Sequence, residues 1–254
     1  MKIGVCKLCD KAKELKNSHV VGRAVFRKAL KGANYGLRFD KKYKKVVKDQ
    51  DQWATYMLCG DCEYKLNTRY EEYSLGVLRN KIKSVKHKKR NNYFEIQGAH
   101  QTKLILYLLS ILWRGVESDH TIFEKLKIFD ASPLVKQLLK DCLYNEKLYR
   151  SDFFNIRISK LVNPIESLQI DDLDFISDFS CKIDENNRVR FLIIFEGYSF
   201  EIFFLTDTSQ PVSGLGVLKK NKRILKMPYI DVFSIPEFRK SLIEMLNTVN
   251  KDNL

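Results

Sequence analysis

The sequence predicts an α+β protein, in which a small cysteine-rich module precedes a domain of helices and an antiparallel β-meander. Three observations lead to this prediction. Two CxxC pairs lie within the first 62 residues. Apolar residues then follow helical spacing through the middle of the chain. From about residue 175 the apolar pattern changes to the period of two that is typical of strands.

Four of the six cysteines form the two matched pairs, Cys6–Cys9 and Cys59–Cys62. Each CxxC can form a tight turn, or knuckle, that points both sulfurs at one centre, and four thiolates satisfy tetrahedral Zn²⁺. A thioredoxin-like redox pair would use one CxxC and leave the other unexplained. We therefore expect the four cysteines to bind a structural zinc ion. Cys142 and Cys181 stand alone in apolar surroundings and are expected to be buried thiols.

The segment between the two pairs contains a histidine in a strand-like context. Residues 15–26, LKNSHVVGRAVF, place His19 before β-branched residues, so this histidine can lie on a strand of a hairpin. After the second pair, CEYKLNTRYEEYSLGVL has apolar residues at helical spacings and predicts a helix that starts near Cys62. The predicted order is knuckle, hairpin with histidine, knuckle and helix, which is the order in a zinc-bound ββα-metal site.

The pattern CKLC…SHVV…LCGDCE resembles the zinc-containing HNH endonucleases over roughly the first 75 residues. The resemblance implies that His19 is the general base and that Glu63, at a position usually occupied by histidine, binds a catalytic Mg²⁺ or Mn²⁺. Ser18 departs from the family, which usually has His or Asp there, and Ala54–Thr55 stands where its asparagine is expected. With LSILWRG at residues 109–115, the pattern also resembles uncharacterised bacterial proteins labelled HNH-like.

Two alternatives remain open at this site. His19 can be the base that activates water, or a hydrogen-bonded structural histidine packed under the knuckles. Glu63 can be a metal ligand, or it can stabilise the N-terminus of its helix through the helix dipole. Asp61 and Asn17 lie close enough in sequence to replace the ligand that Ser18 does not supply.

The positive charge is concentrated in one part of the chain. Residues 1–100 contain 24 Lys and Arg against 10 Asp and Glu, whereas residues 101–254 contain 21 of each. Concentrated positive charge favours polyanions, so we expect a nucleic-acid partner. Two basic runs flank the predicted site and are expected to contact phosphates; their cations are Lys41, Lys42, Lys44, Lys45, Lys88, Lys89 and Arg90.

The remaining elements follow in chain order. TKLILYLLSILWRGVES predicts a buried helix, HTIFEKLKI has a capping-box spacing at Thr121 and Glu124, and SPLVKQLLKDCLYNEK predicts an amphipathic helix after Ser132. Residues 175–207 predict three antiparallel strands, GVLKKNKRILKM a further hairpin, and Ser234 the start of a final helix. The predicted units are residues 1–78, a basic linker over 79–92, and residues 93–254.

The predicted function is a metal-dependent endonuclease, a hydrolase that cleaves phosphodiester bonds, with DNA as the expected substrate. The alternative is a non-catalytic zinc-stabilised module that binds nucleic acid or a protein, with the C-terminal domain available to a protein partner. The N-terminus shows no signal peptide, and the longest apolar run, LILYLLSILW, is about half of the roughly 20 residues that a membrane span requires. We therefore expect a soluble cytoplasmic protein without a membrane partner.

Overall fold

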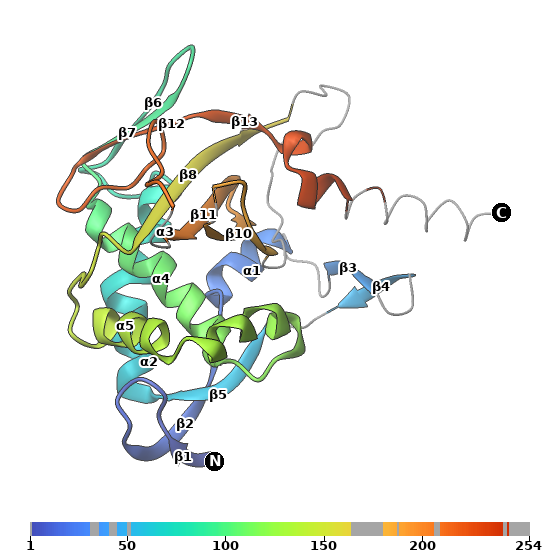
Figure 1. The fold of residues 1–254 in the computed structure, drawn as a ribbon, viewed down its shortest axis with the longest axis vertical. Helices are drawn as coiled ribbons and strands as arrows, with labels where there is room; N and C mark the ends of the chain where they lie inside the picture. Colours follow the sequence, from blue (N-terminus) through green and yellow to red (C-terminus); the bar gives the residue numbers. More distant parts are fainter. Residues whose placement is uncertain are drawn as a thin grey trace.

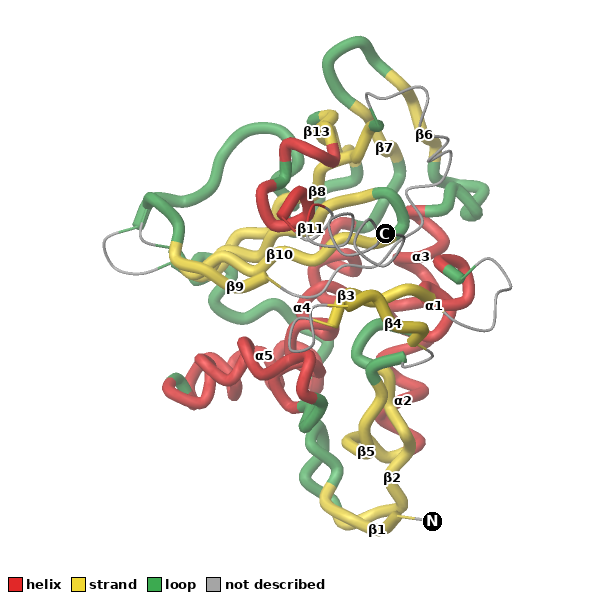
Figure 2. Tube along the Cα trace, turned by 90° about the vertical axis from the view of Figure 1, so that its right-hand side faces the viewer, coloured by secondary structure: helices red, strands yellow, loops and turns green. Residues whose placement is uncertain are grey.

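The computed structural model describes residues 2–30, 36–40, 45–49, 52–163, 180–186, 188–205 and 209–240, together with Ile243. It confirms the α+β class, because helices are combined with sheets that are largely antiparallel (Figures 1 and 2), whereas the HNH-like character of the N-terminal module stays a prediction. The N-terminal sheet lies at one end of the long axis, and the β6–β7 hairpin projects at the other.

The N-terminal sheet has the order β1-β2-β5 and is antiparallel. Its strands are β1 (Lys2–Val5), β2 (Ala12–His19) and β5 (Ala54–Cys59). Between β2 and β5 the chain forms α1 (Arg23–Ala29) and a separate hairpin of β3 (Gly36–Asp40) and β4 (Lys45–Asp49). The sequence pattern did not predict α1, because a short apolar stretch with β-branched residues also fits a strand.

A nearly continuous helical run follows β5. It consists of α2 (Gly60–Leu66), a π-helical turn η1 (Asn67–Glu71) and α3 (Glu72–Leu78). The predicted helix near Cys62 is therefore confirmed, with its start at Gly60. The π-helical turn was not predicted, because it adds one residue to a turn without changing the composition of the segment.

A second three-stranded sheet joins distant parts of the chain in the order β12-β7-β6. Its strands are β6 (Lys86–Lys89), β7 (Phe94–Gln97) and β12 (Ile224–Met227). The hairpin predicted for residues 216–227 is wrong. Val217 instead forms an isolated bridge with Arg157, and β12 pairs with β7, where Leu225 and Met227 are buried.

The predicted meander, residues 175–207, is confirmed where it is described, and it forms one side of a larger sheet with the order β13-β8-β11-β10-β9. Residues 175–179, 187 and 206–207 of the predicted strands lie outside the described residues. The strands are β8 (Phe154–Val162), β9 (Ser180–Ile183), β10 (Val189–Phe195), β11 (Tyr198–Phe204) and β13 (Tyr229–Asp231). β8 and the parallel edge strand β13 were not predicted. At the β10–β11 turn, Glu196 and Gly197 both have positive φ angles (56° and 70°), as a two-residue hairpin of this twist requires.

The predicted buried helix is α4 (Gln101–Glu117), which lies at the centre of the molecule (Figure 1). The predicted amphipathic helix is α5 (Pro133–Tyr144), although Leu134 of its apolar stripe is 85% exposed. The segment between them is a 3₁₀-helix, η2 (Thr121–Ala131), and Thr121 does not cap it. The His120 ring accepts a hydrogen bond from the Ile122 N–H (3.2 Å) instead. The final helix begins at residue 236, after the 3₁₀ turn η3 (Val232–Ser234).

One cluster of buried apolar residues extends from Cys6 to Met227, so the two predicted units share a core. A buried polar contact crosses the same junction, where the Glu196 carboxylate accepts hydrogen bonds from Arg79 and from Lys28 (3.1 Å). The division at residues 78 and 92 stays a prediction. Within the described part of the chain, no helix has both the length and the apolar character needed to cross a membrane.

Candidate functional site

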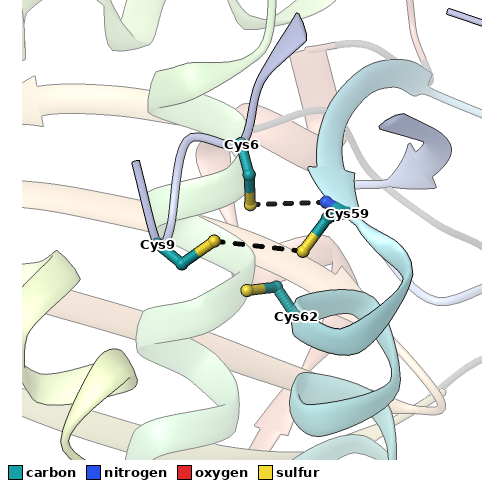
Figure 3. A group of neighbouring side chains, drawn as sticks. All are labelled: Cys6, Cys9, Cys59 and Cys62. Carbon is teal, nitrogen blue, oxygen red and sulfur yellow. Dashed lines mark hydrogen bonds between the residues drawn. The ribbon is translucent and has the colours of Figure 1, made fainter. Parts of the chain in front are cut away.

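The four paired cysteines form one cluster (Figure 3). Cys6 and Cys9 lie in the turn that connects β1 to β2, Cys59 is the last residue of β5, and Cys62 lies in the first turn of α2. Their sulfurs all lie within 4.8 Å of one another. The cluster depends on strand pairing, because Leu15 of β2 lies opposite Cys59 and so brings the two knuckles together.

The spacing of the sulfurs fits a four-coordinate metal ion. The Cys9 and Cys59 sulfurs are 3.9 Å apart. Four sulfurs at about 2.3 Å from a central ion lie about 3.8 Å from one another in a tetrahedron. All six cysteines are free thiols in the structure. The cluster can therefore hold a metal ion, as the two CxxC pairs predicted.

The electrostatics of the four thiols are unequal. Burial raises the pKa of Cys6, but backbone N–H groups that include that of Cys59 (3.3 Å from the sulfur) outweigh burial, so the net pKa is lowered. Burial and the neighbouring sulfurs of Cys59 and Cys6 raise the pKa of Cys62 well above its usual range. Burial raises the pKa of Cys9 as well. Four thiolates repel one another, so a bound cation is needed for all four to lose their protons.

Ion pairs brace the cluster from both sides. Lys13 of β2 contacts Asp61 of α2 (2.6 Å), and Lys140 of α5 contacts Asp10 of the first knuckle (2.6 Å). A cleft of about 460 Å³ beside the knuckle is lined by charges that are largely paired with one another, for example Lys136 with Glu117 (3.4 Å). With the pair of Lys7 and Glu117 (3.9 Å), these contacts connect the cysteine knuckles to α5 and to the end of α4.

His19 is the last residue of β2 and is half-buried. Burial lowers its pKa, and the positive charges of Arg23 and Arg114 lower it further. A hydrogen bond to Gln52 and the negative charge of Glu63 act in the opposite direction but do not cancel burial. The imidazole is therefore neutral near pH 7 and can accept a proton.

Glu63 lies in the first turn of α2, near enough to His19 to influence its pKa. Its Oε2 atom is buried and has no hydrogen-bond partner in the described part of the chain. A buried carboxylate oxygen without a partner is energetically costly and is a common feature of functional sites. This oxygen fits the metal-ligand role implied for Glu63 better than the helix-dipole role alone.

A buried ion pair that the sequence did not reveal fixes the chain after His19. Arg114 of α4 is 2% exposed, donates to the His19 carbonyl (2.8 Å), and lies 3.6 Å from the Glu71 carboxylate. Glu71 ends the π-helical turn and packs under Gly22, where a Cβ would overlap its carboxylate. Burial raises the pKa of Glu71, Arg114 lowers it, and the charge of Glu63 raises it again. An arginine within an otherwise apolar helix was the available signal, because buried arginines are normally paired.

Neither Ser18 nor the two residues suggested as its replacements, Asp61 and Asn17, adds a ligand to this site. Ser18 is buried and donates to the Lys16 carbonyl (3.3 Å). Asp61 is held by Lys13, and Asn17 lies opposite Tyr56 in the sheet. In the described part of the chain, the four cysteines are the one group of three or more His, Cys, Asp or Glu ligand atoms that gathers closely enough to hold a metal ion.

The predicted phosphate-binding residues are only partly described. Lys41, Lys42 and Lys44 lie outside the described residues, and Lys45 is the first residue of β4, opposite Asp40. Lys88 and Lys89 belong to β6, and Arg90 follows it with its side chain exposed. The two basic runs therefore belong to separate hairpins.

Comparison with known proteins gives no relative for this chain. No family model, no curated protein and no solved structure matches it.

We predict that Cys59→Ser releases the bound metal and destabilises the N-terminal sheet, because it removes one of four ligands. Elemental analysis of the purified variant measures the loss. Cys142→Ser is the matched control, since Cys142 is buried outside the cluster and this variant keeps its metal. A native protein without metal, or with a Cys6–Cys9 disulfide, would contradict the assignment.

We also predict that His19 titrates below the usual value of about 6.5. Because burial is the largest cause, the folded state disfavours the protonated ring, so the stability that His19 contributes is present above its unfolded pKa and falls as pH decreases through its folded pKa. NMR titration of the imidazole measures this pKa directly. A value at or above that of a histidine in an unstructured peptide would show that Glu63 outweighs burial.

Proposed function

We propose that the protein is a metal-dependent, HNH-like endonuclease whose four cysteines bind structural Zn²⁺, and that its substrate is DNA. One observation carries this proposal. At the end of β2, the neutral His19 lies near a buried Glu63 oxygen that has no hydrogen-bond partner among the described residues, and the strand pair β2–β5 leads directly into the helix that contains Glu63. This arrangement agrees with the strand, strand and helix order of the resemblance.

The thiolate cluster supports zinc as the structural metal. Zn²⁺ prefers tetrahedral coordination by thiolates and has no redox chemistry, whereas oxygen ligands suit Mg²⁺ and Mn²⁺. The short edge between Cys9 and Cys59 fits Zn–S bonds of about 2.3 Å. In this proposal the zinc fixes the scaffold and takes no part in hydrolysis.

The residues of the site have separate roles in the proposed hydrolysis. His19 accepts a proton from the attacking water, and Gln52 orients its ring through a hydrogen bond. Glu63 would hold a single Mg²⁺ or Mn²⁺ ion, which supplies positive charge to the phosphate when it is bound. Since few protein ligands are available, phosphate oxygens would complete its coordination.

Arg114 and Glu71 act as positioning residues. Arg114 binds the His19 carbonyl rather than its ring, and Glu71 packs against Gly22 three residues later. Both contacts restrain the backbone at the end of β2. The backbone that carries the His19 ring is thereby fixed, and the ring itself makes neither contact.

A specific observation favours a second candidate, a zinc-stabilised binding module without catalysis. Ser18 and Asp61, which could have been ligands, make hydrogen bonds within the protein instead. A site with Glu63 as its one anionic ligand binds a divalent ion weakly. In that case the module would bind nucleic acid or a protein, and His19 would be structural.

A nuclease assay of the zinc-loaded full chain with added Mg²⁺ or Mn²⁺ separates the two candidates. We predict that His19→Ala lowers the cleavage rate by about 10² to 10⁴-fold, the contribution of a positioned base, and keeps the zinc. Glu63→Gln should raise the concentration of Mg²⁺ or Mn²⁺ that is required. In the wild type the rate should rise with pH through the lowered pKa of His19 and then level off, because the base must be neutral.

The matched control is His120→Ala, which removes an imidazole that caps η2 and lies outside the proposed site. It should cleave at the wild-type rate at temperatures where it remains folded. If the wild type cleaves nothing with either ion, and His19→Ala lowers only the melting temperature, the binding-module candidate is correct.

A further inference from the structure

The sheet β12-β7-β6 brings two basic segments together that lie far apart in the sequence. Residues 79–97 contain seven Lys and Arg and one acidic residue, Glu95. Residues 217–227 contain five Lys and Arg and no acidic residue. The second segment lies within residues 101–254, whose net charge is zero. The net charge of that part of the chain therefore gave no sign of a basic segment. Pairing of β12 with β7 places both segments in one sheet (Figure 1).

The cations of this sheet are on its surface. Five Lys and Arg between residues 81 and 90 are exposed, and so are five between residues 219 and 226. We call these ten side chains the β6/β12 basic surface. They are Lys81, Lys83, Lys86, Lys89, Arg90, Lys219, Lys220, Lys222, Arg223 and Lys226. Within the described part of the chain, none of the ten forms an ion pair with a carboxylate. By contrast, Arg190, which is largely buried, is paired with Glu201 (2.6 Å).

The strand register explains why one acidic residue does not neutralise this surface. Glu95 of the central strand lies opposite both Lys88 and Lys226, so two cations flank one carboxylate. Glu95 is 5% exposed and accepts a hydrogen bond from Gln97 (2.7 Å). The other face of the same strands buries apolar residues, including Ile96 and Leu225. The sheet therefore presents a positive face outward and packs its apolar face inward.

The turn before β12 is held in a fixed position. Gln101, at the start of α4, donates from its backbone N–H to the Lys222 carbonyl (3.2 Å) and accepts from the Lys219 N–H (2.8 Å). Thr102 accepts from the Asn221 N–H (3.0 Å). Because the backbone of the turn is already ordered, binding costs less conformational entropy than it would in a free loop.

We propose that the β6/β12 basic surface binds the phosphate backbone of a nucleic-acid duplex. Many cations without counter-ions favour a polyanion, and release of condensed ions drives such binding. The aromatic rings of the described strands and turns are poorly placed to stack on the bases of a single strand. Phe94 is buried, the half-buried His87 ring is hydrogen-bonded to the Val77 carbonyl (2.8 Å), and Tyr93 is half-buried beneath Lys226. One apolar side chain, Ile224, is well exposed here, which is little for insertion into a membrane.

The choice of nucleic acid as ligand rests on the proposed function, but the location of the surface does not. The surface lies at the end of the molecule away from the cysteine cluster (Figure 2). Its cations can therefore be reversed without changing the metal ligands or His19.

The test is fluorescence anisotropy of the zinc-loaded full chain with a labelled DNA duplex of about 20 base pairs, over a range of salt concentrations. Lys222→Glu with Arg223→Glu alters the β12 side, and Lys89→Glu with Arg90→Glu alters the β6 side. Lys125→Glu with Lys240→Glu is the control, because these exposed lysines lie outside the sheet and give the same change in net charge.

Each altered side should weaken duplex binding by about tenfold or more and reduce the slope of log K against log salt by about 2, since about two phosphate contacts are lost. The control pair should bind within about twofold of the wild type. The same measurement with duplex RNA shows which of the two duplexes binds more tightly. A preference for either one, lost in the same variants, agrees with the proposal.

Wild-type affinity of the Lys222→Glu, Arg223→Glu variant would overturn the proposal, and so would equal weakening by the control pair. Wild-type protein that binds vesicles with anionic lipid through the same residues, but not the duplex, would assign the surface to membranes instead. If duplex binding depends on this surface while no cleavage occurs with Mg²⁺ or Mn²⁺, the endonuclease proposal fails and this one stands.

Discussion

The convergence of four cysteine sulfurs is the constraint on which the N-terminal half depends. Cys9 and Cys59 are 50 residues apart in the chain, yet their sulfurs are 3.9 Å apart. This closure fixes where β1 turns into β2 and where β5 passes into α2. It also accommodates α1 and the β3–β4 hairpin as an insertion between the knuckles. A metal ion that binds all four sulfurs turns this arrangement into folding free energy, because the unfolded chain offers no such site.

The buried pair of Arg114 and Glu71 extends this order to the proposed active site. Arg114 comes from the central helix α4, and Glu71 from the π-helical turn after α2. Together they hold the backbone from His19 to Gly22, so the end of β2 is fixed from two helices. An uncompensated buried charge would cost several kcal/mol, about 3–5 when one partner is removed. The pair therefore couples the position of His19 to the core that both halves of the protein share.

Local signals made the cysteines, the two long helices and the meander predictable. A CxxC knuckle has geometry of its own, α4 is apolar almost all round, and Glu196–Gly197 is a strong turn signal. Non-local features escaped prediction for physical reasons. β12 finds its partner in β7 across more than a hundred residues, and nothing in residues 216–227 distinguishes this pairing from a hairpin. Likewise, the π-helical turn that directs Glu71 towards Arg114 leaves no compositional trace, although the lone arginine of α4 indicated that a buried partner exists.

Hydrogen exchange measured by mass spectrometry on the full chain, with and without removal of its metal by a chelator, tests this dependence most directly. Removal should abolish the protection of amides in β2, β5 and α2, and it should leave the meander strands β10 and β11 and the neighbouring β8 protected. The peptide that contains His19 should lose protection together with the knuckles, since the same closure fixes both. Unchanged protection of β2, β5 and α2 in the metal-free protein would contradict the account, because strand pairing and the Arg114–Glu71 pair would then suffice without the metal.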